Sequence, residues 1–232
     1  LVVDYDTTVN SSPTDISGQG NHGTFRDSSG APSYSPADKA FNFSGVNGVI
    51  VSGALSPAMT GDRICSMSCW FKTTDAANNN TQTLMWLGAY SGQGFIGLLI
   101  QNNQLKLTIG SERAIKTTSS PIQSNQWYHV VAIKSGTGQI NSSTANGYFQ
   151  IYINGEKSTD TTFQNQTGTL NITTNYLYLG AGGVSGQEPL NGYISNPKLY
   201  NVALEPSEVK KLYNLGRTGR SMVISDTAVG IG

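Results

Sequence analysis

The chain has 232 residues, of which 12% are charged, and its acidic and basic side chains balance to a formal net charge of zero. This balance excludes a general electrostatic attraction to nucleic acid or to an anionic membrane, and no apolar run is long enough for membrane insertion. The chain begins at Leu1 without a basic and apolar signal segment, as expected for a mature or excised piece. Frequent turn-forming residues among aromatic and β-branched ones predict an all-β protein.

Apolar positions that alternate with polar ones, bounded by glycine, proline and asparagine, predict a series of strands. In chain order these strands are residues 1–6, 39–45, 48–51, 64–72, 83–87, 94–101, 104–109, 126–133, 148–153, 170–173, 175–180 and 192–200. Asn102-Asn103 is a predicted hairpin turn, so that the three strands between residues 83 and 109 form a meander. The polar, glycine-rich residues 10–25 are predicted as a loop.

Two cysteines, Cys65 and Cys69, lie on one predicted strand. Four residues along a strand span roughly 13 Å, whereas a disulfide needs Cα atoms about 4.4–6.8 Å apart. The two residues therefore cannot be joined to each other, and we expect small buried thiols in preference to metal ligands or disulfides. Free thiols favour synthesis in a reducing compartment, but a buried thiol also persists outside, so the sequence leaves the compartment open.

The stretch from Gln126 to Lys157 predicts two long strands and a tight turn. The first strand carries apolar residues on both faces, which predicts a central place in a sheet, whereas the second has one buried and one wetter face. Asn154-Gly155 favours a two-residue hairpin turn, because both central positions need a positive φ, and a further strand should follow at once. Residues 135–147 are predicted as an inserted surface loop.

One helix is predicted, at residues 204–214, and is expected to dock on the sheets. Pro206 fits the first helical position, where its missing N–H has no partner to lose, and Glu208 fits the first turn, where the helix dipole favours a negative charge. No composition break divides residues 1–215, which we assign to one domain. Residues 216–232 are predicted as a C-terminal tail that leads to a further segment.

Six stretches of the chain carry a family pattern in the order in which they occur. They are the loop Asp15-Ile16-Ser17-Gly18-Gln19-Gly20-Asn21-His22-Gly23, the strands Ala40-Phe41-Asn42-Phe43-Ser44-Gly45 and Met67-Ser68-Cys69-Trp70-Phe71, the pair Trp127-Tyr128-His129-Val130 and Tyr152-Ile153-Asn154-Gly155, and the segment from Gly192 to Tyr213. Together they resemble the laminin-G-like, concanavalin A-like lectin/glucanase superfamily over nearly the whole chain. The resemblance implies a jelly-roll β-sandwich of two antiparallel sheets with one short C-terminal helix, whose first and last strands are neighbours.

The chain departs from this family at Ser195-Asn196-Pro197, where many members carry paired aspartates that are tied to calcium. The departure removes two carboxylates from the expected metal site. Pro197 also cannot donate a hydrogen bond to a neighbouring strand, so its strand is expected either at the edge of a sheet or with a bulge.

The glucanases of this superfamily place two catalytic glutamates on one strand, because a retaining mechanism needs two carboxyl groups roughly 5 Å apart. The glutamates of this chain, none with an acidic partner two positions along a strand, are Glu112, Glu156, Glu188, Glu205 and Glu208. His129 lies among core-like residues without a nucleophile-elbow motif, and is interpreted as a packed structural histidine. We therefore predict that the chain is not an enzyme, with a glycoside hydrolase as the less favoured alternative.

The loop from Asp15 to Gly23, here called the early loop, is the candidate metal site. Asp15 and Asn21, with backbone carbonyls around Gly18 and Gly20, would supply part of the oxygen shell that calcium requires. Aspartate, asparagine and glycine also form turns through their own hydrogen bonds and positive φ angles. The sequence therefore leaves two alternatives open, a calcium cofactor and a plain turn.

Glycan binding is implied by the resemblance, and it needs amide, carboxylate and aromatic side chains on loops that a rigid scaffold holds. Three loops carry such groups, at residues 78–80, 89–93 and 185–189. The candidate ligand-binding residues are Asn78, Tyr90, Gln93, Gln187 and Glu188. Ordinary solvated loops are the alternative, because a fold alone does not place a site.

Residues 227–232 resemble the lead-in to the C-terminal chaperone modules of viral fibre proteins. We therefore predict a non-catalytic, lectin-like recognition or adhesion module of a larger surface or virion fibre protein. Its partner would be a glycan or glycoprotein on a cell surface, its location extracellular or on a virion, and a fibre would allow an oligomeric chain. The competing prediction is a structural or protein-interaction domain without a glycan site.

Overall fold

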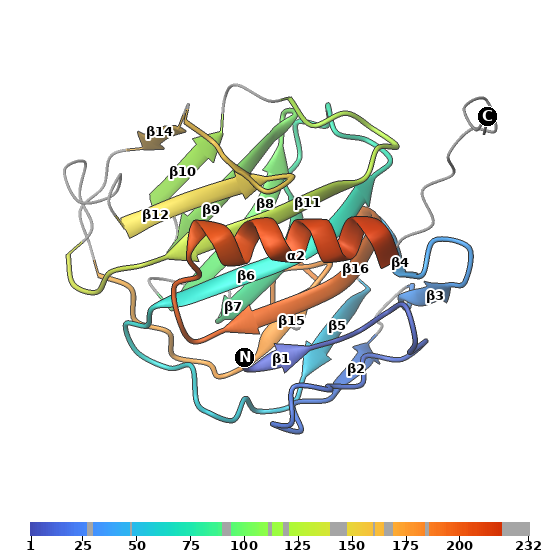
Figure 1. The fold of residues 1–232 in the computed structure, drawn as a ribbon, viewed down its shortest axis with the longest axis horizontal. Helices are drawn as coiled ribbons and strands as arrows, with labels where there is room; N and C mark the ends of the chain where they lie inside the picture. The colour runs from blue at the N-terminus through green and yellow to red at the C-terminus, as the bar shows by residue number, and fades with distance from the viewer. Residues whose placement is uncertain are drawn as a thin grey trace, which may run out of the picture.

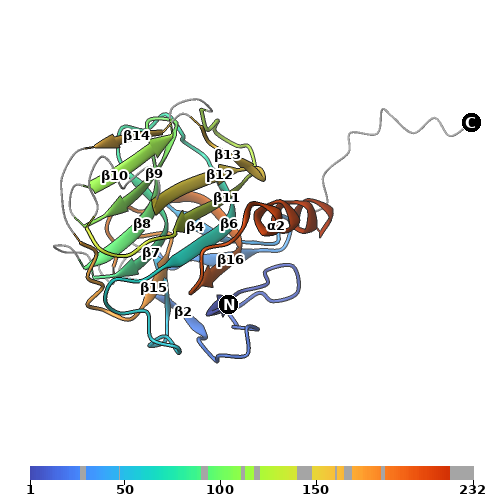
Figure 2. The same ribbon diagram turned by 60° about the vertical axis from the view of Figure 1, so that its left-hand side comes forward.

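A computed structural model of the protein describes residues 1–26, 30–46, 48–89, 94–110, 113–117, 121–139, 148–159, 161–164, 169–183 and 186–219. Within these residues two antiparallel sheets pack face to face, and one helix, α2 (Pro206–Gly219), lies on the outside of the first sheet (Figures 1 and 2). The predicted jelly-roll sandwich with a single C-terminal helix is confirmed. No helix of the described residues combines the length and hydropathy needed to cross a membrane.

Each sheet has eight strands among the described residues, and every pairing is antiparallel. The first sheet runs β13 (Glu156–Lys157), β12 (Phe149–Ile153), β11 (Tyr128–Lys134), β6 (Cys65–Thr73), β16 (Asn191–Tyr200), β4 (Ala40–Ser44) and β3 (Ser33–Ser35), with β1 (Val3–Asp4) paired to β16. The second sheet runs β14 (Thr161–Gln164), β10 (Arg113–Thr117), β9 (Gln104–Ile109), β8 (Phe95–Gln101), β7 (Gln82–Gly88), β15 (Leu177–Leu179), β5 (Val49–Ser52) and β2 (Gly23–Arg26).

The main hydrophobic core fills the space between the two sheets. Phe41 and Phe71 from the first sheet and Leu98 from the second are fully buried in it. Cys65 and Cys69 belong to the same core as buried thiols outside any disulfide, as predicted for both.

Strand β11 is buried on both faces. Val130 and Ala132 lie in the core between the sheets, whereas Val131 and Ile133 pack on the opposite face in a cluster with Val209 of α2. The strand pairs with β6 on one side and with β12 on the other. Its uninterrupted apolar sequence therefore reflects a central place in the sheet, as predicted.

Two hairpin turns form where the sequence predicts them. Asn102 and Asn103 have φ angles of 52° and 63° between β8 and β9. Asn154 and Gly155 have φ angles of 52° and 81°, and strand β13 follows at once. Asparagine and glycine tolerate this left-handed conformation better than other residues, which is why these short signals are dependable.

Strand β16 holds the first sheet together. It lies between β6 and β4, and it also pairs with β1, so that the first and last strands are neighbours as predicted. The register with β6 shifts between Ser195 and Lys198, which takes Pro197 out of the ladder. Of the two predicted outcomes for Pro197, the bulge is confirmed and the edge position is wrong.

The prediction of a strand at residues 170–173 is wrong. Leu170 and Ile172 are each only 1% exposed, so the alternation does report burial, but the backbone makes only a single bridge, between Ile172 and Gly61. The predicted loop also ends in a strand, β2, and three further strands that the sequence does not predict are β3, β10 and β14. These strands have three to five residues and many polar side chains, so their pattern is weak.

Helix α2 begins at Pro206 as predicted, and the Glu205 N–H donates to Glu208 Oε2 at 2.8 Å. It continues to Gly219, beyond the predicted end at residue 214, so the first four residues of the predicted tail are helical. Residues 220–232 lie outside the described residues, and their role as a tail stays a prediction. The predicted loop at residues 135–147 is described only as far as residue 139.

The far half of α2 rests on aromatic side chains of the first sheet. Tyr213 stacks on Trp70 with ring centroids 5.7 Å apart, and His129 lies 5.3 Å from Trp70. Gly216 passes so close that a Cβ atom there would lie 2.1 Å from Trp70 Nε1. The helix position therefore depends on the missing side chain at Gly216.

Replacing Gly216 with alanine tests this contact. Alanine favours an isolated helix by about 1 kcal/mol over glycine, but the clash with Trp70 should outweigh this and lower the free energy of unfolding by about 1–3 kcal/mol. Urea unfolding of Gly216→Ala against Lys211→Ala, an exposed position of the same helix, measures the difference. A Gly216→Ala protein as stable as the wild type would contradict this packing.

Lys134 is a buried cation at the base of the predicted surface loop. Its side chain is 0% exposed, and Nζ lies 2.6 Å from Asp62 Oδ1 and donates to the Gly136 carbonyl. A buried charge is tolerated only with such partners, because the desolvation of an unpaired ammonium is strongly unfavourable.

The two members of this ion pair should respond differently to removal. Asp62→Ala leaves a buried ammonium without its counter-ion and should lower the free energy of unfolding by about 3–5 kcal/mol. Lys134→Met removes the buried charge itself and should destabilise less. Chemical denaturation of both variants at neutral pH gives the comparison, and equal losses would refute the asymmetry.

Candidate functional site

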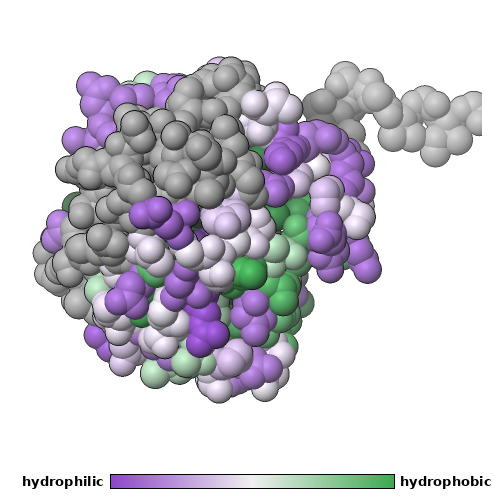
Figure 3. Space-filling model, turned by 90° about the vertical axis from the view of Figure 1, so that its left-hand side faces the viewer, coloured by the Kyte–Doolittle hydropathy of each residue, from purple (hydrophilic) through white to green (hydrophobic). Residues whose placement is uncertain are grey.

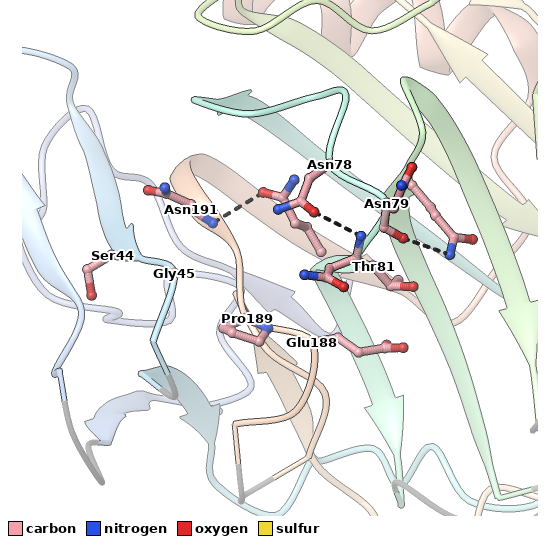
Figure 4. Close-up of a pocket in the computed structure, with 11 residues that line it drawn as sticks. Ser44, Gly45, Asn78, Asn79, Thr81, Glu188, Pro189 and Asn191 are labelled. Carbon is pink, nitrogen blue, oxygen red and sulfur yellow. Dashed lines mark hydrogen bonds between the residues drawn. The ribbon is translucent and has the colours of Figure 1, made fainter.

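A hollow of about 610 Å³ opens at one end of the sandwich, where loops of the two sheets meet (Figure 4). Its walls come from the end of β4, the segment between β6 and β7, the end of β8, and the loop that leads into β16. The residues that line it, nearly all of them polar, are Ser44, Gly45, Asn78, Asn79, Asn80, Thr81, Gln82, Gln101, Glu188, Pro189 and Asn191.

Hydrogen bonds between the walls hold the hollow open. Asn78 Oδ1 accepts from the Asn80 N–H at 2.9 Å, and Gln101 Nε2 donates to the Asn79 carbonyl at 3.3 Å (Figure 4). Gln82 Oε1 accepts from the Thr73 hydroxyl at 2.9 Å and from the N–H of Asn191, the first residue of β16, at 3.2 Å. Hydrogen bonds therefore tie the polar loop segments of the hollow to the ends of neighbouring strands.

Glu188 is the one acidic residue among those lining the hollow. Figure 4 shows its side chain extending from the loop before β16 toward the segment that carries Thr81. Burial raises the pKa of the Glu188 carboxyl above its ordinary value, although the Lys106 ammonium and a hydrogen bond with the Thr81 side chain act in the opposite direction. The hollow thus combines neutral amides with one half-buried acid.

Two of the five candidate ligand residues come together in this hollow, namely Asn78 and Glu188. Gln187 is exposed and is not among the lining residues, and its backbone pairs with Gly182. Tyr90 and Gln93 lie outside the described residues. Of the described residues that flank them, Ala89 follows β7 and Gly94 precedes β8. Both lie at the strand ends opposite to the hollow, about 20 Å along a seven-residue strand. Ligand binding by all five stays a prediction.

Several residues of the hollow are not predicted from the sequence, among them Ser44, Gln101 and Asn191. Asn191 pairs with Ser44 across the first sheet, and Gln101 closes the β8–β9 hairpin. Ser44, Gln101 and Asn191 lie on strands that are far apart along the chain, so spacing carries no signal that they share a hollow. The one local signal for a polar site here is Asn191, which directly precedes Gly192 at the start of β16.

The early loop turns its polar side chains inward. Asp15 Oδ1 accepts from the backbone N–H groups of Asp4 at 2.9 Å and Ser17 at 3.0 Å, and Oδ2 accepts from the Ser17 hydroxyl and the Asn21 N–H, both at 2.8 Å. The Asn21 side chain donates to the carbonyls of Val2 and Ser56 and accepts from the Ser56 N–H. These residues thus form a buried, hydrogen-bonded turn.

This geometry does not fit a calcium site, because the oxygens of Asp15 and Asn21 already accept hydrogen bonds from the protein. At the bulge, Ser195 Oγ donates to the Lys39 carbonyl at 2.9 Å, and Asn196 Oδ1 accepts from the Thr7 N–H at 3.0 Å. No cluster of three metal-binding side chains occurs among the described residues. Calcium binding stays a prediction from the sequence.

A smaller hollow of about 230 Å³ lies between α2 and the first sheet. Its lining includes Ser68 and His129, whose Oγ and Nε2 atoms are 3.1 Å apart. Such a pair can serve as nucleophile and base, but each side chain is only 2% exposed. His129 is therefore packed beneath the helix, as the sequence analysis predicts.

A comparison with known protein families identifies the family to which this fold belongs. The family model described as the concanavalin A-like lectin/glucanases superfamily matches residues 44–210. The chain belongs to this superfamily. The match spans β5 to the first turn of α2, so it includes most strands of both sheets and all the residues that line the hollow, but not β1, β2 and β3. A comparison with curated proteins finds no match to the chain.

Several solved structures resemble this sandwich. The fourth domain of AbnA, a GH43 extracellular arabinanase from Geobacillus stearothermophilus solved with arabinotriose, has a TM-score of 0.65 at 21% identity, over 92% of this chain and 98% of that one. The binding domains of botulinum neurotoxin serotypes D/C and C1 both have a TM-score of 0.63, at 17% and 16% identity. This chain spans about half of each toxin domain, 51% in both cases. At these identities the likeness shows the fold alone.

The pH dependence of stability tests the role of Asp15. Burial acts to raise the pKa of its carboxyl, but the hydrogen bonds from Asp4, Ser17 and Asn21 outweigh burial and lower it. The stabilisation is therefore complete above about pH 4, the ordinary range of an aspartate, and is lost as the pH falls through the lower value in the folded protein. At pH 7, Asp15→Asn should lower the free energy of unfolding by about 1.5–3 kcal/mol, and the difference should shrink below pH 4.

Thermal unfolding from pH 2 to 8 gives these values, with Asp75→Asn, an exposed acid, as the control. Millimolar calcium or a chelator should leave the melting temperature unchanged. A calcium-dependent rise that Asp15→Asn abolishes would instead favour the metal site.

Proposed function

We propose that the chain is a non-catalytic carbohydrate-binding module, and that the hollow at the end of the sandwich is its binding site. The observation that carries the proposal is the lining of amides and hydroxyls around one carboxylate, on four strand ends and the loop segments beside them. Each amide offers both donors and an acceptor, which is the complement of a saccharide hydroxyl. The volume of about 610 Å³ lies within the roughly 300–1,000 Å³ of small-ligand sites.

The superfamily supports the same proposal. The arabinanase domain with this fold was solved with a bound oligosaccharide, and the toxin domains are named as binding domains. In both cases the sandwich is part of a larger protein, and we propose the same for this chain, outside the cell on a surface. The fibre context rests on residues 227–232, which lie outside the described residues.

Binding without cleavage is part of the proposal. Hydrolysis with retention needs two carboxyl groups about 5 Å apart, and hydrolysis with inversion needs them about 6.5–9.5 Å apart. Among the residues that line the hollow, Glu188 is the one carboxylate. A single acid has no second carboxyl group to act as nucleophile or to activate water. A bound saccharide would therefore dissociate without being cleaved.

A protein-interaction domain is the second candidate, and one observation favours it. Figure 3, turned by 90° from Figure 1, shows hydrophobic residues gathered in one area within a largely polar surface. Large apolar side chains are exposed at several places, among them Val9, Val202 and Leu215. Exposed apolar groups mark protein contacts when they are contiguous.

Saccharide binding at the hollow is tested on a glycan array, followed by calorimetry with each saccharide that binds and with arabinotriose. Asn78→Ala and Gln101→Ala each remove an amide and should raise the dissociation constant about 3- to 10-fold, since a hydrogen bond contributes about 0.5–1.5 kcal/mol. Gln187→Ala lies just outside the lining and should bind like the wild type. Polysaccharide incubated with the protein should release no reducing ends.

The failures of this experiment point to different alternatives. Binding that Gln187→Ala abolishes and Asn78→Ala spares would move the site away from the hollow. No binding to any saccharide, together with capture of a protein partner, would support the interaction domain. New reducing ends would show a glycoside hydrolase.

A further inference from the structure

Glu188 has a backbone conformation that is unusual for a glutamate. Its φ angle is 52°, in the left-handed region that glycine and asparagine adopt far more readily. The backbone is held there, because the Thr83 N–H donates to the Glu188 carbonyl at 2.9 Å and the preceding residue pairs with Gly182. Glycine would fit this position without strain, so what Glu188 adds is its side chain.

That side chain is placed where it meets a ligand. It is half-buried and lines the hollow (Figure 4), and the side chain of Thr81, on the segment between β6 and β7, forms a hydrogen bond with its carboxyl. Strained residues concentrate at functional sites, where the surrounding structure offsets the strain. The carboxylate contributes acceptors to a wall that otherwise consists of amides and hydroxyls.

The residues that line the hollow carry a negative charge but no positive charge. No lysine, arginine or histidine is among the described residues that line it, and Glu188 is the one group there with a charge. Lys106, on β9, acts on the Glu188 carboxyl but does not line the hollow. An anionic ligand would therefore approach a negative charge without a cation beside it in the wall, in a half-buried site where screening is weak.

We infer that Glu188 is a specificity-determining residue, which selects neutral, hydroxyl-rich saccharides and rejects saccharides that carry carboxylate or sulphate. A carboxylate can accept hydrogen bonds from two neighbouring hydroxyls of a neutral sugar, whereas it repels an acidic one. This inference rests on the proposed function and names the ligand class of the same site.

The test compares neutral and acidic saccharides on wild type and variants. The probes are oligosaccharides of glucose, galactose and arabinose, with glucuronic acid, galacturonic acid and sulphated oligosaccharides beside them. The wild type should bind neutral probes about tenfold or more tightly than their acidic counterparts. Glu188→Gln keeps the shape and removes the charge, so this ratio should fall toward one. Glu205→Gln removes the same charge at an exposed position on the helix side and should keep the wild-type ratio.

A second variant separates function from structure. Glu188→Gly relieves the backbone strain, so its melting temperature should equal or exceed that of the wild type while the preference for neutral probes disappears. A lower melting temperature with an unchanged preference would overturn the inference and assign Glu188 a structural role. Equal binding of neutral and acidic probes by the wild type would also overturn it but leave the hollow as a saccharide site. Binding of no probe at all would refute the proposed function itself.

Discussion

The burial of the first sheet on both faces is the constraint on which the rest of the structure depends. Strands β6 and β11 face the core with one set of side chains and α2 with the other, and Trp70 lies at the centre of the outer contact. Apolar residues at successive positions of a strand would otherwise face water. The helix therefore covers a second hydrophobic cluster on the outer face of the first sheet, and the close approach of Gly216 to Trp70 sets its distance from the sheet.

Local chemistry decides which parts of this fold are predictable from the sequence. The turn at Asn154-Gly155 and the helix start at Pro206 each depend on a few neighbouring residues, and both form as predicted. The bulge at Pro197 follows from a missing N–H, although only the sheet order shows that the strand is central. Residues 170–173 show the limit, since their alternation reports burial without a neighbouring strand to pair with.

The candidate site could be predicted only in part, for the same reason. Asn78 and Glu188 carry suitable groups on loops, which a sequence shows, but their meeting depends on strand order. Asn191 and Gln82, whose hydrogen bond joins two walls, are 109 positions apart. The early loop shows the opposite limit, because the residue types that bind calcium also form turns, and the sequence does not show that the Asp15 carboxylate accepts hydrogen bonds from Asp4 and Asn21.

Strand β16 has a consequence for the order in which the molecule assembles. It pairs with β1, β4 and β6, so the first sheet stays in separate pieces until a strand near residue 200 is in place. Contacts between segments so distant in sequence form slowly, because a long loop must close first. The loop that carries Glu188 leads directly into this strand, and its hollow therefore completes only when the sheet does. Only the fully folded chain would therefore have a complete hollow that can bind a ligand, and a partly folded intermediate would lack it.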